Sequence, residues 1–191
     1  KGSTMKFETK VIHAGQSPDP TTGAVMTPIY ATSTYAQASP GEHKGYDYAR
    51  TRNPTRDALE ACLAELEGGH SGFAFASGMA AITTLTETIP HGAHVVAPDV
   101  MYYGTRDWLQ RLESLGRITL TLFDPRHDGA LAEALQKGRT DFVWIETPLN
   151  PTWDVIDIAA AARDAHAAGA ILAVDATASA TVTTRPLALG A

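Results

Sequence analysis

From residue 73 onward, short apolar runs alternate with helical segments, and this alternation constrains the fold more than any other feature. Strands are predicted at 73–76, 95–97, 118–122, 142–145 and 171–174. Helices are predicted between them at 79–88, 105–115, 129–137 and 157–167. Strands that alternate with helices form a mostly parallel sheet that is covered on both faces. We therefore predict an α/β fold.

The N-terminal part of the chain lacks this alternation. Residues 1–4 precede Met5 and resemble vector-derived sequence, so they are left out of the fold prediction. Residues 5–50 show little periodicity and contain four prolines, which predicts an extended arm that packs on another element.

One strong helix is predicted after the arm. Asn53 is a suitable N-cap, Pro54 a suitable first helical residue, and Gly68 a suitable stop. The helix carries apolar residues at i, i+3, i+4 and i+7, which predicts one buried stripe made of Leu59, Cys62, Leu63 and Leu66.

Composition narrows the functional class. The net charge of −6 does not favour a nucleic-acid-binding protein. A single cysteine, Cys62, excludes an intramolecular disulfide and favours the cytoplasm. No apolar stretch is long enough to span a bilayer, so no membrane partner is expected. The histidines lack clustered partners, so no metal site is predicted.

Polar residues follow three of the predicted strands. They are Ser77-Gly78-Met79 after the first strand, residues 146–150 after the fourth, and residues 175–177 after the fifth. In an open parallel sheet, ligands bind beyond the carboxyl ends of the strands, so these residues are expected to converge on one site.

Two of these segments suggest specific chemistry. Free N–H groups where a helix begins at Ser77-Gly78 can bind a phosphate, although an ordinary strand-to-helix turn has the same pattern. Asp175 ends a buried strand, where a carboxylate needs a partner. That partner could be a protonated ring nitrogen, or Asp175 could equally be a helix cap or part of an ion pair.

Six motifs give the chain a family resemblance. In order they are "TKVIHAGQSPDPTTGAVMTPIYATSTYAQ", "YDYARTRNPTRDALE", "ASGMAA", "YYGT", "VWIETPLNPTWDVIDI" and "VDATASATVTTRPLALGA". The chain thereby resembles the Cys/Met-metabolism family of enzymes that depend on pyridoxal 5'-phosphate (PLP). The resemblance implies PLP-dependent transferase fold type I, which is aspartate-aminotransferase-like, and residues 51–191 would be the first part of the PLP-binding domain. The Schiff-base lysine and the C-terminal domain, with the arginine that binds the substrate carboxylate, would lie beyond Ala191.

The resemblance also implies individual roles for cofactor binding. Ser77, Gly78 and Met79 would bind the cofactor phosphate, and Tyr48 and Arg50 would reach the phosphate of a neighbouring subunit. Further roles fall to an aromatic side chain, a carboxylate and two polar residues that surround the pyridine ring. Tyr102, or Tyr103 if the alignment slips by one, would stack on the ring. Asn150 would bind the ring hydroxyl and Asp175 the ring nitrogen. Thr177 would orient Asp175.

Tyr102 and Asp175 would act in catalysis, whereas Glu146 is expected to support its loop. Three departures from the family pattern, Tyr103, Trp153 and Ala176, are expected to mark a subgroup with altered substrate preference. Ala176 is also expected to loosen the positioning of the cofactor ring.

The implied activity is transsulfuration: γ-elimination or γ-replacement on a sulfur amino acid or an activated homoserine. The cystathionine γ-lyase and γ-synthase types are favoured. Methionine γ-lyase, cystathionine β-lyase and O-acylhomoserine sulfhydrylase are alternatives, as is a non-catalytic assembly module. Neither Lys44 nor Lys137 lies in a matching lysine motif, so this chain alone is not expected to complete the reaction. A homotetramer, built as a dimer of dimers with shared active sites, is expected.

Overall fold

The computed structural model describes residues 5–191, so the prediction for residues 1–4 lies outside the described part. The chain divides into two compact units, one ending at Ala74 and the other running from Phe75 to Ala191. The assignment of residues 51–191 to one PLP-binding domain stays a prediction.

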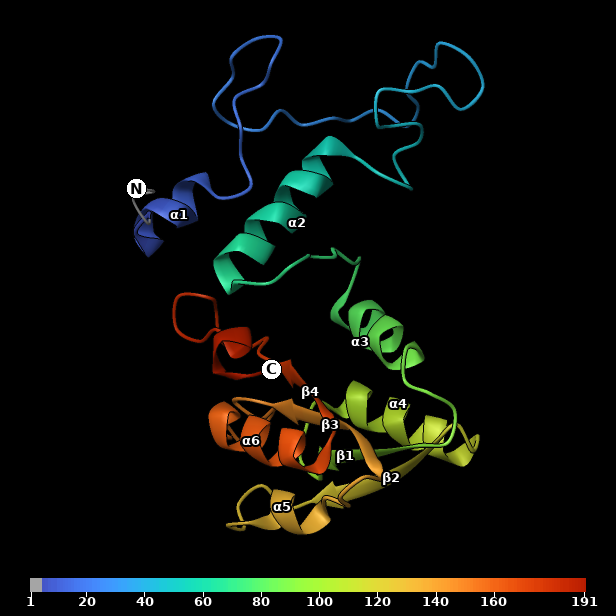
Figure 1. Cartoon of the computed structure of the whole chain (residues 1–191), viewed down its shortest axis with the longest axis vertical. Helices are drawn as coiled ribbons and strands as arrows, with labels where there is room; N and C mark the ends of the chain where they lie inside the picture. The colour runs from blue at the N-terminus through green and yellow to red at the C-terminus, as the bar shows by residue number, and fades with distance from the viewer. Residues whose placement is uncertain (1–4) are drawn as a thin grey trace. The chain divides into compact units, whose positions relative to one another are not determined.

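Among residues 5–74, two helices pack against each other: α1 (Phe7–His13) and α2 (Pro54–Glu67) (Figure 1). The presence of α1 corrects the prediction that all of residues 5–50 are extended. Glu8 lies in its first turn, and Lys10 and His13 lie in its last, an arrangement that the helix dipole favours. The rest of the predicted arm is irregular apart from isolated bridges.

Helix α2 confirms the predicted boundaries. The Asn53 side chain accepts a hydrogen bond from the Thr55 N–H at 2.9 Å, and Gly68 ends the helix with a φ of 74°. The buried stripe, however, is wrong in part: Leu66 is buried, but Leu59 and Leu63 are 50% and 45% exposed. Within its unit α1 packs against α2, but its seven residues are too few to bury a whole stripe.

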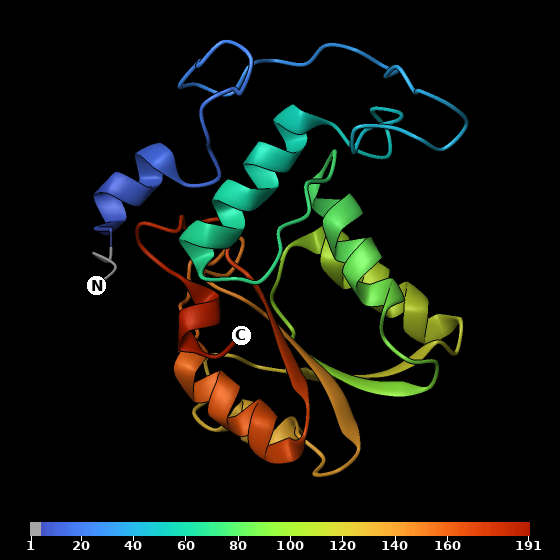
Figure 2. The same ribbon diagram turned by 45° about the horizontal axis from the view of Figure 1, so that its top comes forward.

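The second unit is built on a four-stranded parallel sheet (Figure 2). Its strands, in the order β2-β1-β3-β4, are β2 (Ile118–Phe123), β1 (Ala93–Pro98), β3 (Thr140–Glu146) and β4 (Ile171–Asp175). Every pairing in the sheet is parallel. Four of the predicted strands are therefore confirmed.

Helices cover both faces of this sheet, as predicted. On one face, α3 (Gly78–Glu87) and α4 (Tyr103–Ser114) pack over a core that includes Val95 and Trp144. On the other face, α5 (Ala130–Ala134) and α6 (Ile158–Ala168) pack over Val96 and Ile145. Consecutive strand residues face opposite layers, which explains why the central strands are apolar throughout. No helix in residues 5–191 is long and apolar enough to cross a membrane.

The predicted strand at 73–76 is not a strand. Within residues 5–191 no strand pairs with it, and Phe73 is 78% exposed. The Ala74 N–H instead donates to Glu60 Oε1 at 2.9 Å. An apolar run forms a strand only where a neighbouring strand supplies hydrogen-bond partners, and the sequence of the run does not determine whether one is present.

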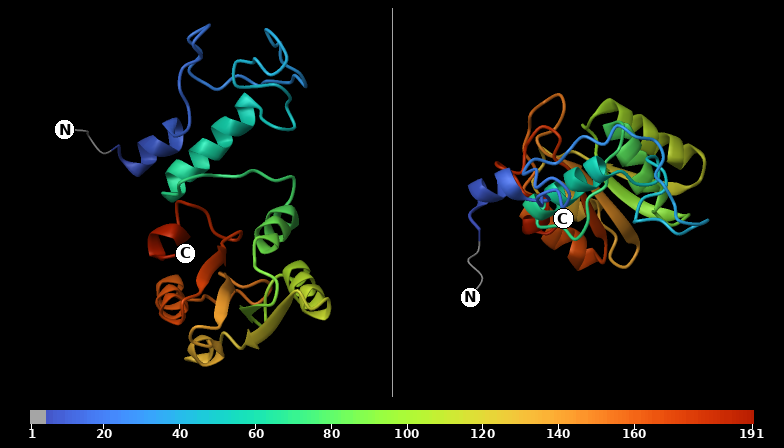
Figure 3. Two further views of the ribbon diagram at one scale, coloured as in Figure 1. Left: turned by 45° about the vertical axis from the view of Figure 1, so that its right-hand side comes forward. Right: turned by 90° about the horizontal axis from the view of Figure 1, so that it is seen from above.

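The strand order creates a switch point between β1 and β3. The chain leaves β1 toward α4 on one face and leaves β3 toward α6 on the other. The loops that follow these neighbouring strands therefore diverge, and the left-hand view in Figure 3 shows the yellow-green α4 and the orange α6 on opposite sides of the sheet. A crevice at such a point is where ligands bind in open α/β sheets.

Candidate active site

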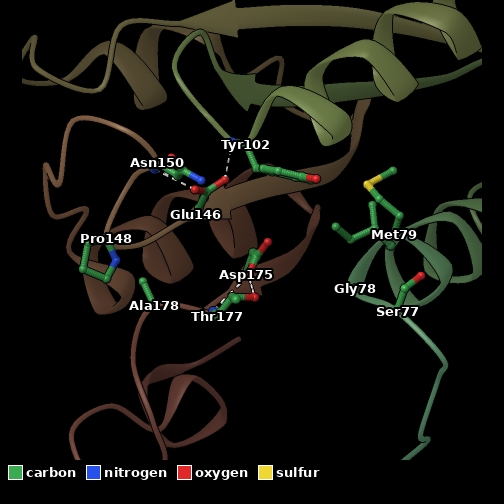
Figure 4. A pocket seen from close by; sticks show the side chains of 11 residues that line it. Ser77, Gly78, Met79, Tyr102, Glu146, Pro148, Asn150, Asp175, Thr177 and Ala178 are labelled. Atoms are coloured by element: carbon green, nitrogen blue, oxygen red, sulfur yellow. Dashed lines mark hydrogen bonds between the residues drawn. The ribbon is translucent and has the colours of Figure 1, made fainter.

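A cavity of about 470 Å³ lies in the second unit at the carboxyl ends of its strands (Figure 4). Its lining residues are Ser77, Gly78, Met79, Ile82, Tyr102, Glu146, Pro148, Asn150, Asp175, Thr177 and Ala178. Seven of the nine residues predicted to bind the cofactor are thus brought together from four segments of the chain. Tyr48 and Arg50 are the two exceptions.

The start of α3 forms one side of the cavity. The Ser77 hydroxyl oxygen accepts a hydrogen bond from the Ala80 N–H at 3.1 Å and so caps the helix. Gly78 and Met79 are the first helical residues, and their N–H groups have no acceptor within the helix. Apart from its chain neighbours and the backbone of its own helix, no atom of residues 5–191 would lie within 4 Å of a Cβ atom on Gly78, so the glycine leaves free space beside these donors. The arrangement suits an anion.

Asp175 lies at the end of β4, on another side of the cavity. Its Oδ1 atom accepts hydrogen bonds from the Thr177 N–H at 3.0 Å and from the Thr177 hydroxyl at 2.5 Å. Within residues 5–191, Oδ2 accepts none and no cationic side chain pairs with Asp175. The ion-pair alternative therefore has no partner among these residues, and the carboxylate can receive a cationic N–H from a ligand.

Glu146 connects the two loops that diverge at the switch point. Its Oε2 atom accepts a hydrogen bond from the Tyr102 N–H, and its Oε1 atom accepts one from the Asn150 N–H, each at 2.7 Å. The side chain is 5% exposed. Burial raises the pKa of Glu146, the two backbone donors oppose that rise, and the charge of Asp175 adds to it. The sequence predicted that Glu146 supports its own loop, but the bond to Tyr102 was not predicted.

Tyr102 lines the cavity, whereas Tyr103 does not and is 71% exposed. This placement favours Tyr102 as the predicted stacking residue. The two ring centroids are 4.8 Å apart with an interplanar angle of 56°. A hydrogen bond with Tyr103 is the main cause that raises the pKa of Tyr102. The other two departures from the family pattern, Trp153 and Ala176, do not line this cavity.

Tyr48 and Arg50 lie together in the first unit. The Arg50 guanidinium carbon is 5.2 Å from the centroid of the Tyr48 ring. Their predicted role toward a neighbouring subunit remains a prediction.

The comparisons with known proteins identify the family. The model of the Cys/Met metabolism PLP-dependent enzymes matches residues 8–191, so the chain belongs to this family. It is 46% identical to a cystathionine beta-lyase of Coxiella burnetii, covering 96% of this chain and 48% of that protein. It is 44% identical to a probable cystathionine gamma-synthase of Herpetosiphon aurantiacus, covering 97% and 58%.

A solved structure shows the same fold. The cystathionine gamma-lyase of Lactobacillus plantarum, complexed with L-serine, matches with a TM-score of 0.88 and 41% identity. The match covers 97% of this chain and 48% of that one. The chain spans about half the length of the relatives it matches.

The cavity fits the family's cofactor. PLP carries a phosphate at one end and a pyridine nitrogen at the other. The start of α3 offers an anion site, and Asp175 offers an unpaired oxygen that suits a protonated nitrogen. The Tyr102 ring extends over the space between them (Figure 4).

Proposed function

We propose that the whole protein is a PLP-dependent transsulfuration enzyme that catalyses γ-elimination or γ-replacement on a sulfur amino acid or an activated homoserine. The observation that carries the proposal is the shared cavity of Asp175 and the start of α3. An anion site and an unpaired carboxylate oxygen on one cavity suit a ring that carries an anionic substituent and a cationic nitrogen. Relatives named as cystathionine lyases and a synthase support the substrate class.

In this proposal each lining residue has a distinct task. The N–H groups of Gly78 and Met79 bind the phosphate, with Ser77 at the same helix start. The Asn150 side chain binds the ring hydroxyl. Asp175, held in place by Thr177, keeps the pyridine nitrogen protonated.

When bound, PLP supplies an electron sink for charge that develops on the amino-acid carbons. Asp175 strengthens that sink because its negative charge favours the protonated ring. Tyr102 covers the ring face and carries a proton at its hydroxyl near neutral pH, as a tyrosine ordinarily does. A tyrosine that stays protonated near neutral pH is suited to donate that proton to a departing sulfur.

The proposed partners follow from the family. An amino acid would be the substrate, and a homo-oligomer, a dimer of dimers, would place Tyr48 and Arg50 of one subunit at the phosphate of another. Arginine suits that task because its planar guanidinium binds phosphate oxygens in a bidentate manner. A cytoplasmic location fits a chain with one cysteine.

The test is to purify the whole protein with PLP and supply cystathionine. γ-Elimination releases cysteine, 2-oxobutanoate and ammonia, whereas β-elimination releases homocysteine, pyruvate and ammonia. γ-Replacement is tested with O-succinylhomoserine and cysteine. Product formation that is lost in D175N supports the proposal. A protein that binds no PLP and forms no product would contradict it and favour an assembly module.

A further inference from the structure

The carboxylate of Glu146 bridges the crevice at the switch point. Glu146 is the last residue of β3, and its two hydrogen bonds end on loops that belong to different strands. Tyr102 follows β1 and precedes α4, while Asn150 lies on the segment from β3 to α6. Because those helices cover opposite faces, the sheet alone does not set the separation of the two loops.

The chemistry of these bonds requires a carboxylate. Both partners are backbone N–H donors, and each reaches a different oxygen of Glu146. A glutamine has one carbonyl oxygen and one amino group, so it can accept from only one of them. An aspartate keeps the charge but is one methylene shorter.

We propose that Glu146 is the positioning residue that sets Tyr102 and Asn150 relative to each other, and thereby sets the orientation of the cofactor ring. This inference rests on the proposed function, in which Tyr102 covers the ring face and Asn150 binds the ring hydroxyl. Loss of one bond frees one loop, and the ring then loses a fixed contact on that side.

The experiment compares E146Q, E146D and T147V with the native whole protein. Thr147 is the matched control because it is also buried and, among residues 5–191, its hydroxyl bonds to Ile156 alone, in the same loop. The readouts are the PLP dissociation constant, the visible circular dichroism of bound PLP, and amide hydrogen exchange at residues 102 and 150. Exchange is measured without PLP, so it tests the bridge independently of cofactor binding.

We expect E146Q to raise the PLP dissociation constant about tenfold, to change the dichroism band and to speed amide exchange at residue 102 or 150. E146D should behave like E146Q because its reach is shorter, and it also serves as the test should E146Q fail to fold. T147V should leave amide exchange at residue 102 unchanged, because the bonds that it removes lie within the segment that carries Asn150. Native exchange and native dichroism in E146Q would overturn the proposal. If E146D behaves like the native protein while E146Q does not, the negative charge of residue 146 is what matters, and the positioning role is overturned in favour of an electrostatic one.

Failure of the two proposals can be told apart. If the native protein binds no PLP, the proposed function fails, while faster exchange in E146Q would still establish the bridge. If PLP binds normally to E146Q with unchanged dichroism, the positioning role fails and the proposed function stands.

Discussion

A Cβ atom added to Gly104 would lie 2.7 Å from Cε1 of Tyr102. It would also lie 3.0 Å from the sulfur of Met79. The Tyr102 ring therefore occupies space that only a glycine at position 104 leaves open. Because Gly104 is the second residue of α4, the ring position depends on the backbone at the start of that helix.

Substituting Gly104→Ala should displace the Tyr102 ring. We expect PLP affinity to fall about tenfold, which corresponds to roughly 1.4 kcal/mol, with little loss of helix stability because alanine favours helices. Equilibrium binding measured by visible absorbance checks this. In a Y102L background the smaller side chain removes the clash, so the same substitution should then have little effect. An equal loss in both backgrounds would contradict the steric explanation.

Substituting Gly78→Ala should weaken PLP binding without changing the stability of the fold. The added methyl group meets no atom of residues 5–191 outside its own helix and chain neighbours, so the free energy of unfolding should stay within about 1 kcal/mol of the native value. It fills space beside the first N–H groups of α3, so phosphate binding should weaken at least about tenfold. Urea unfolding and PLP titration measure the two effects. Thr84→Ala, on the exposed side of the same helix, is the control and should leave PLP binding unchanged.

Thr177→Val tests the support of Asp175. The substitution removes the hydroxyl that donates to Asp175 Oδ1 and leaves the backbone N–H bond in place. We expect PLP affinity to fall about three- to tenfold, consistent with the loss of one hydrogen bond to a charged group. Thr177→Ser keeps the hydroxyl and should retain native affinity. Equal affinities for the Val and Ser variants would show that the hydroxyl is dispensable.

His94 should make stability depend on pH. It is 4% exposed, and its ring nitrogens lie 2.9 Å from Thr140 Oγ1 and 2.8 Å from Thr121 Oγ1. Burial is the main cause that lowers the pKa of His94, and the nearby Arg139 lowers it further, against an opposing effect of Asp141.

Because the pKa is lower in the folded state, the unfolded chain binds the proton first as pH falls. His94 should therefore reduce stability below about pH 6.5, by at most about 1.4 kcal/mol per pH unit, until the folded state is protonated too. Urea unfolding of the native chain and of His94→Gln, measured from about pH 8 to about pH 5, checks this. A slope that His94→Gln leaves unchanged would assign the effect to other groups.

Local signals in the sequence determined the parts of the structure that depend on near neighbours. Asn53 and Gly68 predicted the two ends of α2, and apolar runs predicted four strands, because caps and core strands follow from residues close in sequence. The polar residues at 77–79, 146–150 and 175–177 were predicted to converge, and eight of them line one cavity. The order of the strands was not predictable in this way, because pairing joins segments far apart along the chain.

Only the tertiary structure decided which local preferences were realised. The run at 73–76 has the pattern of a strand, but it has no strand partner within residues 5–191. Leu59 and Leu63 have the spacing of a buried stripe, but burial needs a covering element that the helix itself cannot supply. Glu146 binds the backbone of a residue 44 positions away. Hydrogen-bond partners and desolvation come from neighbours in space, so sequence by itself determined the elements and the residue types of the site, and the fold decided their contacts.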